Sequence, residues 1–116
     1  MSRDAGARAE RAAEEHLKSL GWSILERNFR SRRGEIDLVA RDGDTVVFVE
    51  VRARASSAFG TPEETVGPAK RRRLILTAQR WVQSRCPEAP LRFDVIAISP
   101  QGLRHIPDAF DATGFL

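Results

Sequence analysis

Two spacings of apolar residues recur along this chain of 116 residues. Over residues 5–20, apolar side chains return every three or four positions with charged residues between them, which predicts an amphipathic helix. The apolar positions are Ala9, Ala13, Leu17 and Leu20. Gly21 follows as a helix stop. A second helix is predicted from Pro68, a residue favoured in a first helical turn, to about Cys86.

Four shorter segments have the composition of β-strands, at residues 22–29, 35–40, 45–51 and 91–99. The second and third flank Arg41-Asp42-Gly43-Asp44, and Asp-Gly between two β-rich runs is typical of a hairpin turn. The third is apolar on both faces except at Glu50, which indicates a central strand covered on both sides.

The order of these elements predicts an α/β fold, in which a central mixed sheet is flanked by helices. The length suits a single domain over residues 1–116. Residues 53–65 contain serine, glycine and proline and are predicted to form a loop. The tail from Pro100 onwards, with Gly102 and Pro107, is predicted to be irregular.

Composition narrows the classes of protein. Apolar residues make up 41% of the chain and charged residues 30%, which is typical of a globular protein. No apolar run approaches the roughly 20 residues of a membrane helix, and the first residues lack the apolar segment of a secretory signal. Cys86 is the only cysteine, which excludes an intrachain disulfide. We therefore expect a cytoplasmic protein without a membrane partner.

The charge of the chain indicates what kind of partner it could bind. The net charge is +3, and the cations are 17 arginines and two lysines. An arginine-rich surface suits a phosphate-rich partner, although a general bias towards arginine would look the same. Four cations, Lys70, Arg71, Arg72 and Arg73, stand in the first turns of the second helix, where the helix dipole disfavours positive charge. With Arg33 they are predicted to contact nucleic-acid phosphates; the alternative is a solvated face.

Two carboxylates in the predicted hairpin are candidates for a metal site. If Asp42-Gly43 is centred in the turn, Asp37 lies opposite Phe48 and is the diagonal neighbour of Glu50 on one face, at roughly 7–8 Å between Cα atoms. Glu35 and Val39 would share that face with Asp37, as successive side chains of a strand alternate. Glu35 is then a further ligand, or it caps the basic turn before it.

Glu50 stands in a strand so apolar that its ionised carboxylate is costly unless it is paired or bound to a metal. An ion pair with Arg52 or Arg33 is the structural alternative. Oxygen ligands without a nearby His or Cys favour Mg²⁺ or Mn²⁺ over zinc. Elsewhere, Asp94 is expected to pair with Arg92 or a helix terminus, and the two histidines, His16 and His105, to be structural or exposed.

Three segments together resemble the motif series of the PD-(D/E)XK superfamily, which includes restriction endonucleases and archaeal Holliday-junction resolvases. The segments are Glu10, Gly34-Glu35-Ile36-Asp37 and Val49-Glu50-Val51-Arg52. The chain is also similar, over nearly its whole length, to the bacterial YraN family of small proteins. The resemblance implies a restriction-endonuclease-like core, with Asp37 and Glu50 as metal ligands and Glu10 as the helix carboxylate that completes the site.

Arg52 occupies the place of the lysine that is usual in the superfamily. Arginine stays charged and cannot act as a general base, but it can hold the scissile phosphate or stabilise transition-state charge. The resemblance implies a Mg²⁺- or Mn²⁺-dependent endonuclease acting on structured DNA rather than RNA, and a homodimer, because junction-cutting relatives act in pairs. The alternatives are a non-catalytic nucleic-acid-binding protein that keeps the fold, and a structural protein whose buried charges form ion pairs.

Overall fold

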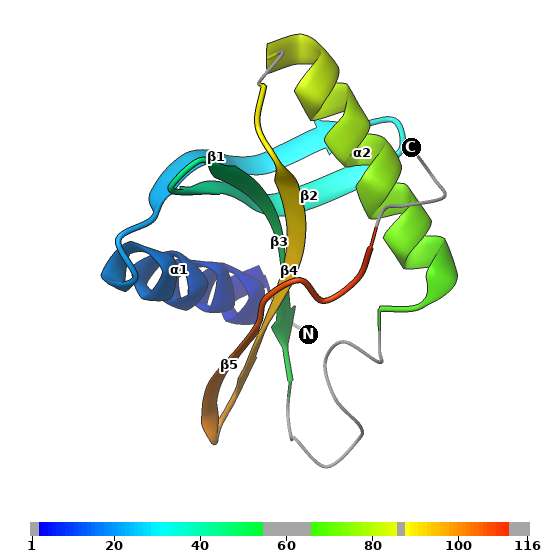
Figure 1. Ribbon diagram of the computed structural model, residues 1–116. Helices are drawn as coiled ribbons and strands as arrows, with labels where there is room; N and C mark the ends of the chain where they lie inside the picture. The colour runs from blue at the N-terminus through cyan, green and yellow to red at the C-terminus, as the bar shows by residue number, and fades with distance from the viewer. Residues whose placement is uncertain (1–2, 55–65, 86–87, 112–116) are drawn as a thin grey trace.

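The computed structural model describes residues 3–54, 66–85 and 88–111, and in this part of the chain two helices and five strands (Figure 1). They are α1 (Arg3–Ser19), β1 (Ser23–Ser31), β2 (Gly34–Asp42), β3 (Thr45–Ala53), α2 (Pro68–Arg85), β4 (Leu91–Ser99) and β5 (Gly102–Ile106). The predicted order of elements is confirmed up to β4. The prediction of an irregular tail is wrong, because β5 pairs with β4. Residues 55–65, which were predicted as a loop, lie outside the described residues, as does Cys86.

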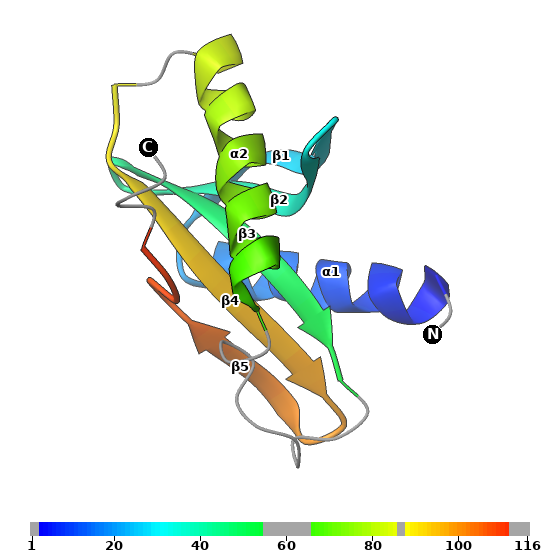
Figure 2. The same ribbon diagram turned by 90° about the vertical axis from the view of Figure 1, so that its right-hand side faces the viewer.

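The strands form one mixed sheet in the order β1-β2-β3-β4-β5. Strands β3 and β4 run parallel, and the other neighbours are antiparallel. The two helices lie on opposite sides of this sheet, as the two views show (Figures 1 and 2). The predicted mixed sheet flanked by helices is therefore confirmed. Within the described residues, neither helix combines the length and apolar character that crossing a bilayer requires.

Each face of the sheet carries a separate hydrophobic core. The core beneath α2 includes Val46, Phe48, Ile75 and Trp81, and the core beneath α1 includes Ala13, Leu17, Val47 and Val49. Strand β3 therefore contributes to both cores with alternate residues, as expected for a central strand covered on both sides.

Helix α1 ends one residue before the predicted apolar face does. The backbone N–H of Gly21 donates to the carbonyl of Lys18 at 2.9 Å, and that of Trp22 to Leu17 at 3.1 Å. Gly21 has a φ of 86°, a left-handed conformation that glycine adopts without steric cost. The chain turns away here, so Leu20, one of the apolar positions at helical spacing in the predicted helix, is 49% exposed.

The turn between β2 and β3 lies one position later than predicted. Asp42 pairs with Thr45, which leaves Gly43 and Asp44 at the centre of the turn. Gly43 has the positive φ, 58°, that tight hairpin turns require. The last paired residues before the site are Leu38 and Val49, and this register brings Asp37 level with Glu50 rather than with Phe48. The partner of each β2 residue moves by two positions, a shift that preserves the facing of side chains.

Strand β2 is irregular at Asp37. Ile36 and Val39 both pack in the core beneath α2, whereas Leu38 packs in the core beneath α1. Strict alternation would place Ile36 and Leu38 on one face, so the alternation breaks between them. The prediction that Glu35, Asp37 and Val39 share a face of a regular strand is wrong for this reason. On β1, Asn28 lies level with Asp37 and has a left-handed φ of 51°.

Candidate metal centre

Three carboxylates meet beside this irregularity. Glu10 comes from α1, and Glu35 and Asp37 come from β2; one carboxylate oxygen of each lies within 4.8 Å of the others. All three side chains are half-buried. Glu10 follows Ala9, which is only 4% exposed, so this turn of α1 faces the interior of the protein. The geometry thus brings together two predicted ligands, Glu10 and Asp37, with Glu35.

Asn28 connects the two glutamates of this group. Its side-chain amide donates to Oε1 of Glu35 at 2.9 Å and to Oε1 of Glu10 at 3.2 Å. The left-handed backbone that Asn28 adopts is one that asparagine tolerates better than most residues. Sequence reasoning missed Asn28, because no local pattern marks a residue that contacts another strand and a helix.

Asp37 is the electrostatic centre of the group. Its Oδ2 accepts a hydrogen bond from the backbone N–H of Val51 at 2.8 Å. Burial raises the pKa of Asp37 to about 8, with the charge of Glu50 as the next cause and the charges of Glu10 and Glu35 as smaller ones; the Val51 bond acts in the opposite direction. Without a cation, the carboxyl of Asp37 therefore carries a proton at neutral pH.

Glu50, the other predicted metal ligand, is not one of these three carboxylates but lines a small pocket together with Glu35 and Asp37. The pocket has a volume of about 200 Å³, and its lining includes Glu35, Asp37, Glu50, Lys70 and Arg73. Glu50 is only 6% exposed. Its Oε1 lies 3.1 Å from Nζ of Lys70 and 3.9 Å from Nη1 of Arg52. The buried carboxylate is thus paired with two cations, and the expected pair with Arg52 is the longer one.

The predicted basic cluster of residues 70–73 does not form one surface. Lys70 pairs with Glu50, and Nε of Arg71 donates to the carbonyl of Val66 at 2.6 Å. Arg71 also lies over the ring of Phe110, 5.5 Å from its centroid. Arg72 and Arg73 are exposed. The sequence pattern that suggested a phosphate contact therefore includes a lysine that lies in the carboxylate pocket, a position that sequence reasoning missed.

A second polar cluster lies at β4 and β5. Asp94 is fully buried and accepts hydrogen bonds from Arg92 at 2.8 and 3.0 Å, which confirms its expected partner. Nε2 of His105 lies 2.8 Å from Asp94, and Nδ1 of His105 lies 3.0 Å from Nε2 of His16. Sequence reasoning did not connect the two histidines, which are 89 positions apart.

In this second cluster, hydrogen bonds to Asp94 compensate the cost of burying its negative charge. Burial disfavours its ionised form, but hydrogen bonds from His105 and Arg92 and from the backbone N–H of Asp108 outweigh burial and lower the pKa of Asp94. Burial, and then the charge of His105, lower the pKa of His16. The cluster joins α1 to the far edge of the sheet and uses no residue of the carboxylate pocket.

Comparison with known proteins matches the chain to one protein family. The family model described as "Uncharacterised protein family UPF0102" matches residues 9–98, a range that contains the carboxylate triad, Glu50 and Lys70. A UPF0102 protein of Ectopseudomonas mendocina is 49% identical over 114 residues, which cover 94% of this chain and 96% of the relative. One of Anaeromyxobacter dehalogenans is 47% identical over 114 residues, covering 94% and 85%. One of Persephonella marina is 46% identical over 107 residues, covering 91% and 92%.

Proposed function

We propose that this chain, which belongs to the UPF0102 family, is a nuclease that hydrolyses phosphodiester bonds of DNA with Mg²⁺ or Mn²⁺. The observation that carries the proposal is the group of three carboxylate oxygens, from Glu10, Glu35 and Asp37, within 4.8 Å of one another. Glu50 and Lys70 line the adjoining pocket. The order of these residues along the chain resembles the motif series of the PD-(D/E)XK superfamily, which supports the same reaction class.

The donor set fits a hard divalent cation. All three groups are carboxylates, the ligands that Mg²⁺ and Mn²⁺ prefer, and Glu10, Glu35 and Asp37 would hold the ion. The raised pKa of Asp37 reflects burial and neighbouring negative charges, an imbalance that a cation would relieve. A divalent cation supplies a Lewis acid, which activates water and neutralises charge on a phosphodiester.

The two cations beside Glu50 can take different parts in the reaction. Arg52 stands where the superfamily usually has lysine, and its guanidinium stays charged, so it can hold a phosphate oxygen but cannot transfer a proton. The ammonium of Lys70 lies 3.1 Å from Oε1 of Glu50 and compensates the charge of that buried carboxylate. We assign Lys70 as the residue that positions Glu50, and Arg52 as the residue that positions the phosphate.

A non-catalytic nucleic-acid-binding protein is the second candidate. It is favoured by Arg52 and by the pairing of Glu50 with Arg52 and Lys70, which neutralises that carboxylate without a metal ion. Under this alternative, the carboxylate group holds a cation for structure and no bond is cleaved.

A cleavage screen separates the two candidates. Branched, single-stranded and duplex DNA of one sequence are incubated with native protein in Mg²⁺, Mn²⁺ or a chelator. Cleavage that requires metal and is lost in Asp37→Asn supports the nuclease. Glu14→Gln is the matched control, because Glu14 lies one helical turn beyond Glu10 and pairs with Lys18 and Arg27 instead. Metal binding without cleavage of any substrate would leave the binding protein as the function.

A further inference from the structure

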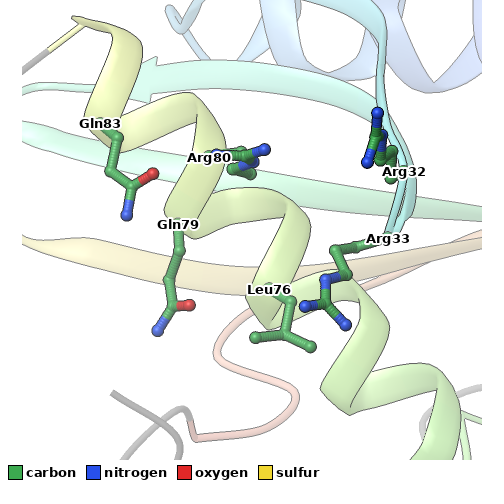
Figure 3. A pocket seen from close by; sticks show the side chains of 6 residues that line it. All are labelled: Arg32, Arg33, Leu76, Gln79, Arg80 and Gln83. Atoms are coloured by element: carbon green, nitrogen blue, oxygen red, sulfur yellow. The ribbon is translucent and has the colours of Figure 1, made fainter.

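A groove lies between α2 and the turn that joins β1 to β2. It has a volume of about 550 Å³ and is lined by Arg32, Arg33, Leu76, Gln79, Arg80 and Gln83. Figure 3 shows Arg33 extending from the turn towards Leu76, and Arg80 extending from α2 towards the turn. Guanidinium groups from two separate elements thus border one space.

Among the residues that the structure describes, the lining of this groove contains three arginines and no acidic residue. None of the ion pairs found among residues 3–54, 66–85 and 88–111 involves Arg32, Arg33 or Arg80. Like charges that converge without a neutralising carboxylate create a positive potential in a concave site, which attracts anions. The guanidinium fork matches the geometry of phosphate oxygens, and the amides of Gln79 and Gln83 add hydrogen-bonding groups.

The groove continues along α2. A second hollow shares Arg80 and Gln83 with it and extends to Arg85 and to Phe29 of β1. Leu76 and Arg85 are nine residues apart, which is about 13.5 Å at the helical rise of 1.5 Å per residue. One strand of a duplex presents a phosphate about every 3.4 Å along the duplex axis, so this length suits more than one phosphate rather than a single free anion.

The groove adjoins the carboxylate pocket. Arg32 and Arg33 border the groove, and Gly34 and Glu35, the next two residues, line the pocket. The two spaces are separated by the contact of this turn with α2: a Cβ at Gly34 would lie 3.4 Å from Oγ1 of Thr77. A nucleic-acid strand that follows the groove therefore passes Arg33, which precedes Glu35 of the carboxylate pocket by two positions in the sequence.

We propose that this groove binds the sugar–phosphate backbone of a nucleic-acid strand and directs it to the carboxylate pocket. Arg32, Arg33 and Arg80 contact phosphates, while Leu76 packs against a sugar or base. The proposal deepens the proposed nuclease function and rests on it for the role of the pocket. Binding in the groove itself needs no metal, so it can be tested where no bond is cleaved.

The test measures binding of a fluorescein-labelled single-stranded DNA, and of RNA of the same sequence, by fluorescence anisotropy in chelator. The variants are Arg32→Gln/Arg80→Gln and, as a charge-matched control, Arg41→Gln/Arg104→Gln. Arg41 is exposed at the opposite end of β2, and Arg104 is exposed on β5, at the other edge of the sheet from the groove. We expect the groove variant to bind at least about tenfold more weakly. Its log–log salt dependence should be shallower by about 0.7 for each lost phosphate contact.

Several results would overturn the proposal. Unchanged affinity in the groove variant would do so, as would an equal loss in the control, which would indicate net charge alone. Competition by inorganic phosphate or a poly-glutamate peptide as effective as unlabelled DNA would assign the groove to small anions or acidic proteins. Because cleavage is absent in chelator, these results are independent of whether the native protein is a nuclease. Metal-dependent cleavage with unaltered binding by the groove variant would retain the nuclease and reject the groove.

Discussion

The ammonium of Lys70, in the first turn of α2, lies 3.1 Å from the carboxylate of Glu50 in the central strand β3. The pair joins a 39% exposed side chain to one that is 7% exposed. Because Glu50 is the buried member, the pair's contribution is expected to appear when Lys70 is removed and the carboxylate remains.

We expect Lys70→Met to lower the free energy of unfolding by about 1–2 kcal/mol, since among the described residues it leaves the buried carboxylate of Glu50 paired only with the more distant Arg52. Glu50→Gln should remove most of that additional loss in the double variant. Urea unfolding of the native protein, both single variants and the double variant measures this coupling. Lys18→Met, which breaks an exposed pair with Glu14, should cost less than about 0.5 kcal/mol. Strictly additive effects of Lys70→Met and Glu50→Gln would contradict the expectation.

Asp37→Asn should stabilise the metal-free protein at alkaline pH. The pKa of Asp37 is raised from 3.8 to about 8, so the folded state binds the proton more tightly than the unfolded state. The resulting stabilisation is fully present below pH 3.8 and is lost as pH rises through 8. The asparagine variant avoids this loss, and we expect it to exceed the native protein by on the order of 2 kcal/mol at about pH 8.5.

Urea unfolding in chelator at about pH 5, 7 and 8.5 measures this difference, which should grow with pH. The amide oxygen that the Asp37→Asn substitution introduces can still accept the hydrogen bond from Val51, so the local shape is kept. A variant that is less stable than the native protein at the highest pH would show that Asp37 is not held in an unfavourable environment.

Metal affinity should rise with pH, because a cation must displace the proton of Asp37. Between about pH 6 and 7.5, below the pKa of about 8, we expect the affinity for Mn²⁺ to increase by up to about tenfold per pH unit. Isothermal titration calorimetry measures both the affinity and the protons released. Glu35→Gln should weaken binding, and Glu14→Gln should not. A pH-independent affinity, or equal effects of the two substitutions, would place the cation elsewhere.

The histidine cluster should make the fold sensitive to acid. Burial and the charge of His105 lower the pKa of His16 from 6.5, so its contribution to stability is fully present above pH 6.5 and is lost as pH falls. His16→Gln should reduce this loss. The comparison is best made in the Asp37→Asn background, because Asp37 acts with the opposite sign over the same pH range. Equal acid sensitivity with and without His16 would assign the effect to other groups, such as Asp94.

The spacing of apolar residues predicted the helices and strands whose buried side chains recur at a regular period. Helix α1 and strand β3 follow helical and strand spacing closely, because each packs against a core along most of its length. Strand β5 was missed, since it is a five-residue edge strand whose first three residues are exposed and carries little apolar alternation. Its formation depends on the free edge of β4, a long-range partner that local sequence does not reveal.

The carboxylates of the site could be found from sequence, but their arrangement could not. Glu50 and Asp37 were evident as acidic residues in apolar strands, whereas the facing of Glu35 depended on a break in β2. The turn was placed one position early, because Asp-Gly and Gly-Asp both occur in Asp42-Gly43-Asp44 and local propensity does not choose between them. Asn28 and Lys70 reach the site from other elements, so only the tertiary structure shows them there.

The break in β2 at Asp37 also has a mechanical consequence. In a regular sheet, the side chains of the helices on the two faces are kept apart by the strands. Here Glu10 of α1 lies close to Glu35 and Asp37 of β2, and Lys70 of α2 lines the pocket that contains the same two carboxylates. The carboxylate pocket is therefore the place where displacements of the two helices act on the same atoms. A core substitution that displaces either helix slightly will change the spacing of the oxygens, even if it lies far from them, whereas a ligand bound there will brace both layers at once.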